Sequence, residues 1–385
     1  MKKLGIVLDN KVNKWALQRF EPLKDKFDIT VFVGERNDYD VSSIDLNMRR
    51  MTRAEEISLA IRDPLIAYKR IIMPPYKKMD FYYFSLKKYL KEFDVVYSCD
   101  ITRSAYTLAS LKDELGFKFI LSWWENIPFR AVFDEKTSFH KKSVMGKVDL
   151  FLPFTNRAKE VLKLEGVPEE KIEVIYPGVD RERFKPGKKT ETFFNRYHIP
   201  ENTFVVLYTG KLVSWKCVHN LIYAARILKN KVIDNFVFAI AGRGAQKENM
   251  IKLIKEADVE ENFRFLDFVS YDEMPQVYRM ADIFVLPSYP TMTWQEQFGM
   301  VLIEALASGK PVISTMSGGI PEVLGDAGIL IPSGDYFQLA ENILRLMKDD
   351  NLRDALGKKA LKIAEELYDA KKNGMQFKGI LENRL

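Results

Sequence analysis

Short apolar runs alternate with helical patterns along most of this chain, and this alternation constrains the fold more than any other feature. Apolar runs of this length are typical of strands that are buried on both faces of a parallel sheet and joined by right-handed helical crossovers. Helices are predicted between the runs, for example over 104–115 and 157–165. The first series of predicted strands comprises residues 4–8, 29–33, 95–98, 117–124, 150–154 and 172–176.

The same pattern starts again after a stretch at 177–189 that is rich in charge and turn-forming residues. From residue 336 onward the period is helical. We therefore predict an α/β protein with two doubly wound, Rossmann-like domains, over 1–182 and 183–368, that face an interdomain cleft. A chain of 385 residues is long enough for two domains. The second series of predicted strands comprises residues 203–208, 236–240, 263–268, 283–287, 311–315 and 329–331.

Composition narrows the class of protein. The chain is 47% hydrophobic and 29% charged, which is typical of a globular protein and not of a disordered one. Cys99 and Cys217 are the only cysteines, so a disulfide framework and a cysteine metal cluster are excluded. No run is long enough to span a membrane, and residues 4–8 are too short for a signal peptide. We expect a cytoplasmic protein.

The net charge of +6 is unevenly distributed, because the excess of Lys and Arg lies wholly within residues 1–200. No nucleic-acid-binding motif accompanies this excess. It therefore predicts an anionic surface or acceptor as a partner, and no nucleic acid.

Residues 296–313 carry the most chemical information. Residues 300–307 are good helix formers, and Gly299 lies where free N–H groups and the helix dipole favour an anion. Glu304 could accept two hydrogen bonds from the diol of a ribose, and Glu296 could do the same for a sugar at the helix tip. The alternative is that both are ordinary exposed carboxylates at a helix start. That alternative is less favoured because the loop is apolar and contains glycine.

This segment resembles the Glu-x7-Glu signature of the family 4 retaining nucleotide-sugar glycosyltransferases, also called group 1 glycosyltransferases. The resemblance covers 150–335, whereas residues 1–150 match only in pattern. It implies a GT-B fold and a hexosyltransferase or other glycosyltransferase that retains the anomeric configuration. It also implies a final helix, about 369–385, that packs back on the first domain. The further matching motifs are 176–180, 210–216, 241–244, 281–288 and 318–323.

The resemblance also assigns the donor site to the second domain. It implies that Lys211 and Lys216 hold the diphosphate, and two cations near a helix N-terminus can stabilise the charge that develops on the leaving group. No metal or other cofactor is then needed. Glu296 is implied to position the donor sugar, and we name no nucleophile because the family is assigned a front-face mechanism. The remaining implied donor contacts are Gly210, Phe268, Val269, Phe298, Gly299, Met300, Val301 and Glu304.

Two donor-side positions depart from the family pattern. Lys211 stands where Arg is common, and it lacks the bidentate fork of a guanidinium. Cys217 stands where Gly is common. Burial at a helix start explains Cys217 better than a redox or catalytic role.

The acceptor side is implied to be the first domain, where the departures are larger. The loop after the first strand lacks the family's glycine pair and offers Lys11 for an anion instead. No histidine follows the strand at 117–124, so Glu125 and Asn126 become the candidate acceptor contacts. The adjacent Trp123 and Trp124 could stack on a sugar or could belong to the core and its rim.

Two alternatives to a transferase stay open. An epimerase or hydrolase of the same fold would bind a nucleotide sugar without a separate acceptor. A noncatalytic nucleotide-sugar-binding protein would be expected to have lost at least one of the four charged donor-site residues. Retention of all four favours transfer.

Residues 68–91 mix aromatic and basic side chains around a predicted amphipathic helix at 79–93. Such a stretch suits an anionic membrane surface and predicts a peripheral protein at the inner membrane face with a saccharide or lipid-linked acceptor. The alternative is that Phe81 and Phe84 pack beneath a neighbouring loop and that the lysines are merely solvated.

Overall fold

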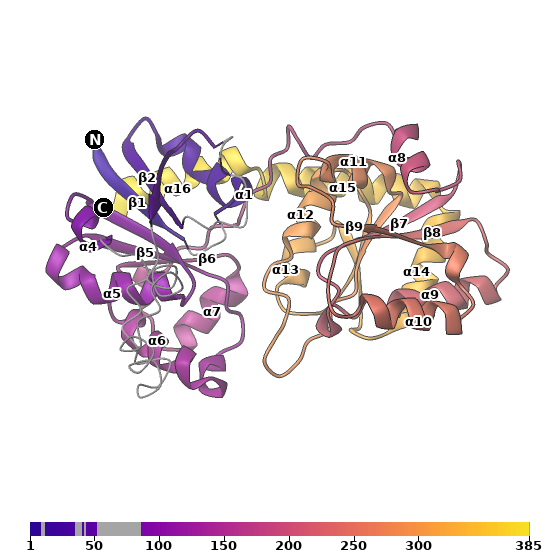
Figure 1. The fold of residues 1–385 in the computed structure, drawn as a ribbon, viewed down its shortest axis with the longest axis horizontal. Coiled ribbons are helices and arrows are strands. Elements are labelled where there is room, and N and C mark those ends of the chain that lie inside the picture. Colours follow the sequence, from indigo (N-terminus) through magenta and orange to yellow (C-terminus); the bar gives the residue numbers. More distant parts are fainter. Residues whose placement is uncertain (9–11, 35–40, 42–43, 52–85, 385) are drawn as a thin grey trace, which may run out of the picture. The chain divides into compact units, whose positions relative to one another are not determined.

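A computed structural model describes all residues except 9–11, 35–40, 42–43, 52–85 and 385. The chain divides into two compact units (Figure 1). The first unit consists of Met1–Gly178 together with Ala370–Leu385, and the second unit consists of Val179–Asp369. The helical tail after residue 336 is therefore shared between the two units. In the described part of the chain, no helix has the length and apolar character of a membrane span.

The first unit is built on a parallel sheet of six strands in the order β3-β2-β1-β4-β5-β6. Five of the predicted strands are confirmed within one or two residues, and β3 is an addition. The strands are β1 (Lys2–Val7), β2 (Phe27–Gly34), β3 (Asn47–Met51), β4 (Val95–Cys99), β5 (Lys118–Trp123) and β6 (Leu150–Pro153).

The predicted strand at 172–176 is wrong. Glu173 and Ile175 donate backbone hydrogen bonds to Phe151 and Pro153 of β6, but only one isolated bridge forms, between Phe151 and Ile172. Pro153 has no N–H to donate in return, so a regular ladder cannot develop beside it.

Helices cover both faces of this sheet. One face packs against α1, η1 and α16, and the other packs against α4, α5, α6 and α7. The side chains of Phe377 and Leu381, both on α16, lie fully buried in the first of these cores. The helices of this unit are α1 (Lys14–Leu17), η1 (Gln18–Leu23), α4 (Leu86–Leu90), α5 (Arg103–Leu115), η2 (Arg130–Phe133), α6 (Glu135–Met145), α7 (Asn156–Leu164), η3 (Glu169–Lys171) and α16 (Ala370–Arg384).

The second unit has a parallel sheet of six strands in the order β12-β11-β10-β7-β8-β9. All six predicted strands are confirmed within one or two residues. They are β7 (Phe204–Thr209), β8 (Phe236–Ala241), β9 (Phe263–Asp267), β10 (Ile283–Leu286), β11 (Val312–Thr315) and β12 (Gly328–Ile331). The strand order reverses between β7 and β10, so the segments that follow these two strands border the crevice in which doubly wound sheets bind ligands.

The helices of the second unit include α12 at the residues predicted for it, and the helical period after residue 336 appears as α14 and α15. They are α8 (Glu191–Arg196), η4 (Ser214–Lys216), α9 (His219–Asn230), α10 (Lys247–Glu256), η5 (Glu260–Asn262), α11 (Met274–Met280), α12 (Met300–Ala307), α13 (Ile320–Leu324), α14 (Tyr336–Lys348) and α15 (Asp350–Leu367).

Candidate functional site

The loops that follow β7 and β8 lie directly against each other. The backbone N–H of Gly210 donates to Ala241 (3.0 Å), and that of Leu212 donates to Arg243 (2.9 Å). A Cβ on Gly242 would lie 1.9 Å from the carbonyl oxygen of Gly210. The close approach of the two loops therefore requires glycine at 242. The side chain of Lys211, in the first of these loops, is exposed.

Lys216 and Glu296 form an ion pair at the N-terminal end of α12. Lys216 ends the short helix η4, and Glu296 lies in the loop before α12. Ser288, which follows β10, donates a hydrogen bond from its Oγ to Glu296 Oε2 (2.7 Å). Glu296 is only 6% exposed, so its interpretation as an ordinary exposed carboxylate is wrong.

The backbone of Glu296 is also fixed. Its carbonyl oxygen accepts a hydrogen bond from the N–H of Gly319 (2.8 Å), and its N–H donates to Ser317 Oγ (3.4 Å). Both partners come from the segment between β11 and α13. Three separate segments of the second unit therefore hold this residue.

Glu304 lies one turn into α12 in a different environment. Tyr278, a buried residue of α11, donates a hydrogen bond from its hydroxyl to Glu304 Oε2 (2.8 Å). The same hydroxyl lies 3.0 Å from Thr209 Oγ1, at the end of β7. Burial raises the pKa of Glu304 to about 7, and the hydrogen bond from Tyr278 partly opposes that rise.

The start of α12 depends on the conformation of Gly299. Its φ of 84° is left-handed, and a Cβ there would lie 2.8 Å from a methyl carbon of Leu302. Phe298 is buried with its ring 5.7 Å from that of Tyr368, whereas Met300 and Val301 are half-buried. Phe298 therefore anchors the loop from inside the unit, and Gly299 turns the chain into the helix.

The loop after β9 places its two candidate residues differently. Phe268 is 66% exposed, and the guanidinium of Arg243 lies 5.3 Å from the centre of its ring. Val269 is buried. Of the two side chains, only that of Phe268 is therefore accessible to a ligand.

Cys217 is buried and has a φ of 51°, a left-handed conformation that favours glycine. This geometry would suit the glycine that the resemblance implies for this position. Burial raises the pKa of the Cys217 thiol to about 11 and lowers the pKa of His219, whose Nε2 lies 3.5 Å from the sulfur. A protonated thiol is a poor nucleophile, which agrees with the interpretation of Cys217 as a buried residue.

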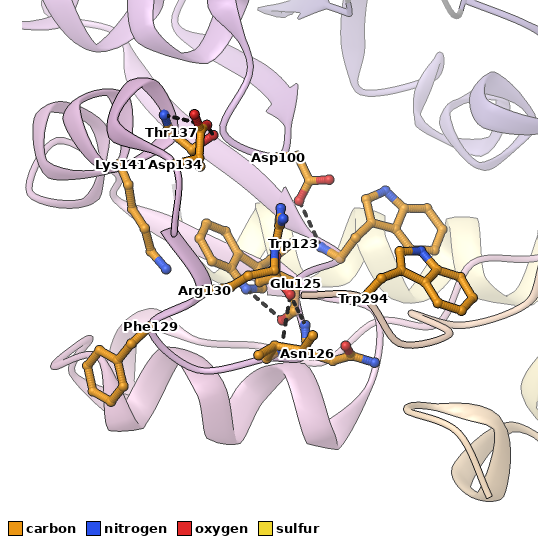
Figure 2. A network of polar contacts seen from close by, with 12 residues as sticks. Asp100, Trp123, Glu125, Asn126, Phe129, Arg130, Asp134, Thr137, Lys141 and Trp294 are labelled. Carbon is orange, nitrogen blue, oxygen red and sulfur yellow. Dashed lines mark hydrogen bonds and ion pairs between the residues drawn. The ribbon is translucent and has the colours of Figure 1, made fainter. Parts of the chain in front are cut away.

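In the first unit, Glu125 shapes the loop that follows β5 (Figure 2). Its Oε1 accepts hydrogen bonds from the backbone N–H groups of Asn126 (3.1 Å) and Ile127 (3.0 Å). Its other oxygen pairs with Arg130. Glu125 and the buried Asn126 are thus parts of one turn, and their acceptor role stays a prediction. Lys11 lies outside the described residues.

The two adjacent tryptophans have different surroundings. Trp123 is buried, and its indole N–H donates to the backbone oxygen of Glu125 (3.0 Å), so it belongs to the core and cannot stack on a sugar. Trp124 is half-buried, with its ring 4.0 Å from that of Phe154. Its indole N–H donates to Cys99 Sγ (3.1 Å). Trp124 is therefore a rim residue.

Sequence reasoning missed several residues around the two carboxylates of α12. Ser288 lies within a motif that the resemblance brought out, but its bond to Glu296 was not foreseen. Tyr278 and Trp294 gave no sequence signal, because α11 and the loop before α12 bring them to the site only in the folded chain. Within the described ranges, no group of three or more His, Cys, Asp or Glu side chains could hold a metal ion.

Two family models match the chain, and together they span most of it. The model described as glycosyl transferases group 1 matches residues 189–363, which include the whole Lys216–Glu296–Glu304 region. The model described as glycosyltransferase family 4 matches residues 33–183. The chain belongs to the group 1 glycosyltransferases of family 4.

Curated members of this family support the assignment. A D-inositol 3-phosphate glycosyltransferase of Streptomyces bingchenggensis is 30% identical over 236 residues, which are 58% of this chain and 51% of that protein. The enzyme of that name from Corynebacterium glutamicum is 33% identical over 204 residues, 51% of this chain and 48% of that protein. The chain spans about half the length of the curated relatives that it matches.

Solved structures of similar fold cover the whole chain. Anabaena Alr3699/HepE, solved with UDP and glucose, has a TM-score of 0.79 and 19% identity, and the match covers 100% of both chains. The sucrose-phosphate synthase of Thermosynechococcus elongatus has a TM-score of 0.77 and 17% identity over 100% of this chain and 99% of that chain. These likenesses confirm the predicted two-domain GT-B fold.

Proposed function

We propose that this family 4 member transfers a sugar from a nucleoside diphosphate sugar to a hydroxyl group with retention of configuration and without a metal ion. The observation that carries the proposal is the contact between Lys216 and Glu296 at the N-terminal end of α12. A cation, a carboxylate and free helix N–H groups at one point suit a diphosphate joined to a polyhydroxylated ring.

Each donor-site residue receives a role from its surroundings. Lys211 and Lys216, with the N-terminus of α12, would bind the diphosphate. Glu304 would accept hydrogen bonds from the ribose, and the exposed Phe268 would lie beside the base. Glu296 would orient the sugar ring. The UDP bound in the similar Anabaena structure supports a uridine nucleotide as the first donor to test.

The proposed transfer needs charge stabilisation more than a nucleophile. The bond from the anomeric carbon to the leaving phosphate oxygen breaks while the acceptor oxygen attacks the same face of the ring. The acceptor proton passes to the departing phosphate. Lys211 and Lys216 would stabilise the negative charge that grows on the diphosphate, which is the work that a divalent cation does in other transferases.

The acceptor is proposed to be an anionic polyol or a lipid-linked saccharide. The basic excess of residues 1–200 supports an anion, and the curated relatives are named for D-inositol 3-phosphate. The loop after β5 and the short helix η2 that follows it also expose three apolar side chains close together in sequence, Phe129, Val132 and Phe133. These three would suit the apolar part of a lipid-linked acceptor.

We also propose a peripheral contact with an anionic membrane surface at its inner, cytoplasmic face. Residues 68–85 of the aromatic and basic stretch lie outside the described residues. In the described remainder, Leu86 and Leu90 are buried, whereas Lys87, Lys88 and Lys91 are exposed. This division fits an amphipathic helix that presents lysines to anionic lipid.

The test of the proposed function begins with a panel of nucleoside diphosphate sugars in a thermal-shift assay, because a ligand of the folded state raises the melting temperature. Products are then analysed for the stabilising donor, with and without anionic polyol and lipid-linked saccharide acceptors. We expect a new glycoside of retained configuration only when an acceptor is present. Conversion of the donor alone would identify an epimerase or hydrolase, and stabilisation without any turnover would identify a binding protein.

Metal independence is tested in the same assay. We expect full transfer in excess chelator, because the two lysines and the helix terminus supply the positive charge. Loss of activity that magnesium or manganese restores would contradict this proposal.

A further inference from the structure

The loop between β10 and α12 carries exposed aromatic and apolar side chains beside the Lys216–Glu296 pair. Tyr289 and Met292 of this loop are exposed, Trp294 is half-buried, and the neighbouring Trp215 of η4 is 39% exposed. Large apolar side chains gathered at the surface are characteristic of binding sites. Their position next to a buried charge pair calls for a ligand with both apolar and polar faces.

Backbone hydrogen bonds fix the two tryptophans that flank this pair. The N–H of Tyr289 donates to the carbonyl oxygen of Trp215 (2.8 Å), and the N–H of Thr291 donates to that of Trp294 (2.7 Å). The indole ring centres lie 5.9 Å apart with the planes at 45°. The backbone at both tryptophans is therefore fixed, and the two rings lie in contact with each other.

Trp294 is tied to the charged pair as well as to Trp215. The ammonium nitrogen of Lys216 lies 5.2 Å from the centre of the Trp294 ring and also pairs with Glu296. The Trp294 ring and the Glu296 carboxylate therefore both lie beside the Lys216 ammonium, where one ligand could contact both. A pyranose has an apolar C–H face, which packs on aromatic rings, and a rim of hydroxyls, which carboxylates bind.

We propose that Trp294 and Trp215 form an aromatic platform that packs against the ring of the transferred sugar while Glu296 holds its hydroxyls. This inference rests on the proposed function. It assigns the platform to the sugar and not to the nucleobase, because the exposed aromatic residue expected beside the base, Phe268, belongs to the separate loop after β9. Trp294 then contacts the transferred sugar directly and selects among donor sugars.

The experiment compares the affinity for a free nucleoside diphosphate with the affinity for the matching nucleotide sugar by titration calorimetry. The variants are Trp294→Ala, Trp294→Phe and Trp215→Ala. Phe337→Ala is the matched control, because Phe337 is also a large exposed aromatic residue (61%) but lies on α14. The melting temperature of each variant is recorded to identify any that unfolds.

We expect Trp294→Ala to bind the nucleoside diphosphate within about twofold of the parent protein and to bind the nucleotide sugar about tenfold more weakly, a range typical of aromatic contacts. Trp294→Phe should recover most of the loss, Trp215→Ala should show a smaller loss of the same kind, and Phe337→Ala should show none. A rise in KM for the sugar donor should accompany the loss.

Three outcomes would overturn the inference. Equal weakening toward both ligands would assign the tryptophans to the nucleotide or to folding. Unchanged affinity for the nucleotide sugar in Trp294→Ala would show that the tryptophans do not bind the sugar, while the assignment of the donor site would still hold. Failure of the parent protein to bind any nucleoside diphosphate would instead refute the proposed function itself, and the platform with it.

Discussion

At the scale of single residues, the two carboxylates of the Glu-x7-Glu signature differ in what neutralises them. Glu296 is paired with a lysine and receives a hydroxyl hydrogen bond, whereas Glu304 receives a hydrogen bond from the phenol of Tyr278. Their spacing was enough to predict their place beside α12. Their environments were not predictable, because the partners come from η4, the segment after β10 and α11.

The raised pKa of Glu304 predicts a pH dependence of ribonucleotide binding. Only the ionised carboxylate can accept hydrogen bonds from both ribose hydroxyls, so affinity should fall as the pH drops through about 7. Below that value we expect a loss of up to about tenfold per pH unit. Calorimetry with a ribonucleoside diphosphate measures it, and the 2′-deoxy nucleotide, which lacks one hydroxyl, serves as the control.

The variant Tyr278→Phe sharpens this prediction. Removing the phenol removes the hydrogen bond that lowers the pKa of Glu304, so the decline in affinity should begin at a higher pH. An unchanged pH profile for Tyr278→Phe would argue that Glu304 does not contact the ribose.

The ion pair of Lys216 and Glu296 predicts coupled effects on stability. Lys216→Ala leaves a buried carboxylate without its cation and should lower the free energy of unfolding by on the order of 3 kcal/mol. In the double variant Lys216→Ala/Glu296→Gln the loss should be smaller than the sum of the two single losses. Urea unfolding measures all four proteins, and additive losses would contradict a direct interaction.

The same variants separate two functional roles. Lys216→Ala and Glu304→Ala should weaken nucleoside diphosphate binding, because both contacts are proposed to exist in the ground state. Glu296→Gln should reduce kcat more than nucleotide affinity, because the sugar contact orients the reacting carbon. Unchanged nucleotide affinity in Lys216→Ala would show that Lys216 does not bind the diphosphate.

At the scale of helices and strands, apolar runs identified eleven of the strands that the structure forms. The residues of β3, Asn-Met-Arg-Arg-Met, were missed because the strand lies at the sheet edge and is mostly exposed, so it has no apolar run. The segment 172–176, by contrast, does have an apolar run, so it was predicted as a strand although it forms none. Ile172 and Ile175 are buried, but the neighbouring Pro153 cannot complete a ladder.

The contact between the loops after β7 and β8 predicts that Gly242→Ala is strongly destabilising. The added methyl would overlap the backbone oxygen of Gly210, which cannot move without breaking the hydrogen bond to β8. We expect a loss of at least about 3 kcal/mol, within the range of overpacking and strain effects. The variant should show a lower melting temperature in thermal unfolding and a weaker affinity for the nucleotide.

Gly379→Ala is the control for this change. Gly379 lies in α16, and a Cβ there meets no atom within 4 Å. Alanine favours helix over glycine by about 1 kcal/mol, so this variant should raise the melting temperature. Equal destabilisation by both substitutions would show that the loop contact is not the cause.

At the scale of the whole molecule, both units follow one topological plan. The first three strands of each series lie side by side on one half of the sheet, and the chain then crosses back past the first strand to build the other half. Repetition of the strand pattern in the sequence predicted this plan. The acceptor site was less predictable, because the first unit lacks the glycine pair and the histidine that the resemblance implies, and Lys11 lies outside the described residues.

The basic excess of the first half predicts salt-dependent binding to lipid vesicles. The protein should sediment with anionic vesicles at low ionic strength and be released as salt screens the attraction, with a Debye length of about 8 Å at 0.15 M. Replacing Lys87, Lys88 and Lys91 with Gln should weaken this binding, whereas neutral vesicles should retain little protein. Equal or absent sedimentation with both lipids would make a soluble acceptor the better account.

The helix α16 makes the first unit discontinuous in the sequence, since residues 370–385 complete a core begun by residues 1–178. The second unit is one uninterrupted segment. On the ribosome, the second unit can therefore fold as soon as its own residues have emerged, whereas the first unit must wait for α16 although its strands were made earlier. We therefore expect the first unit, although synthesised first, to complete its core last, with the sheet surface that Phe377 and Leu381 cover left exposed until translation has passed them.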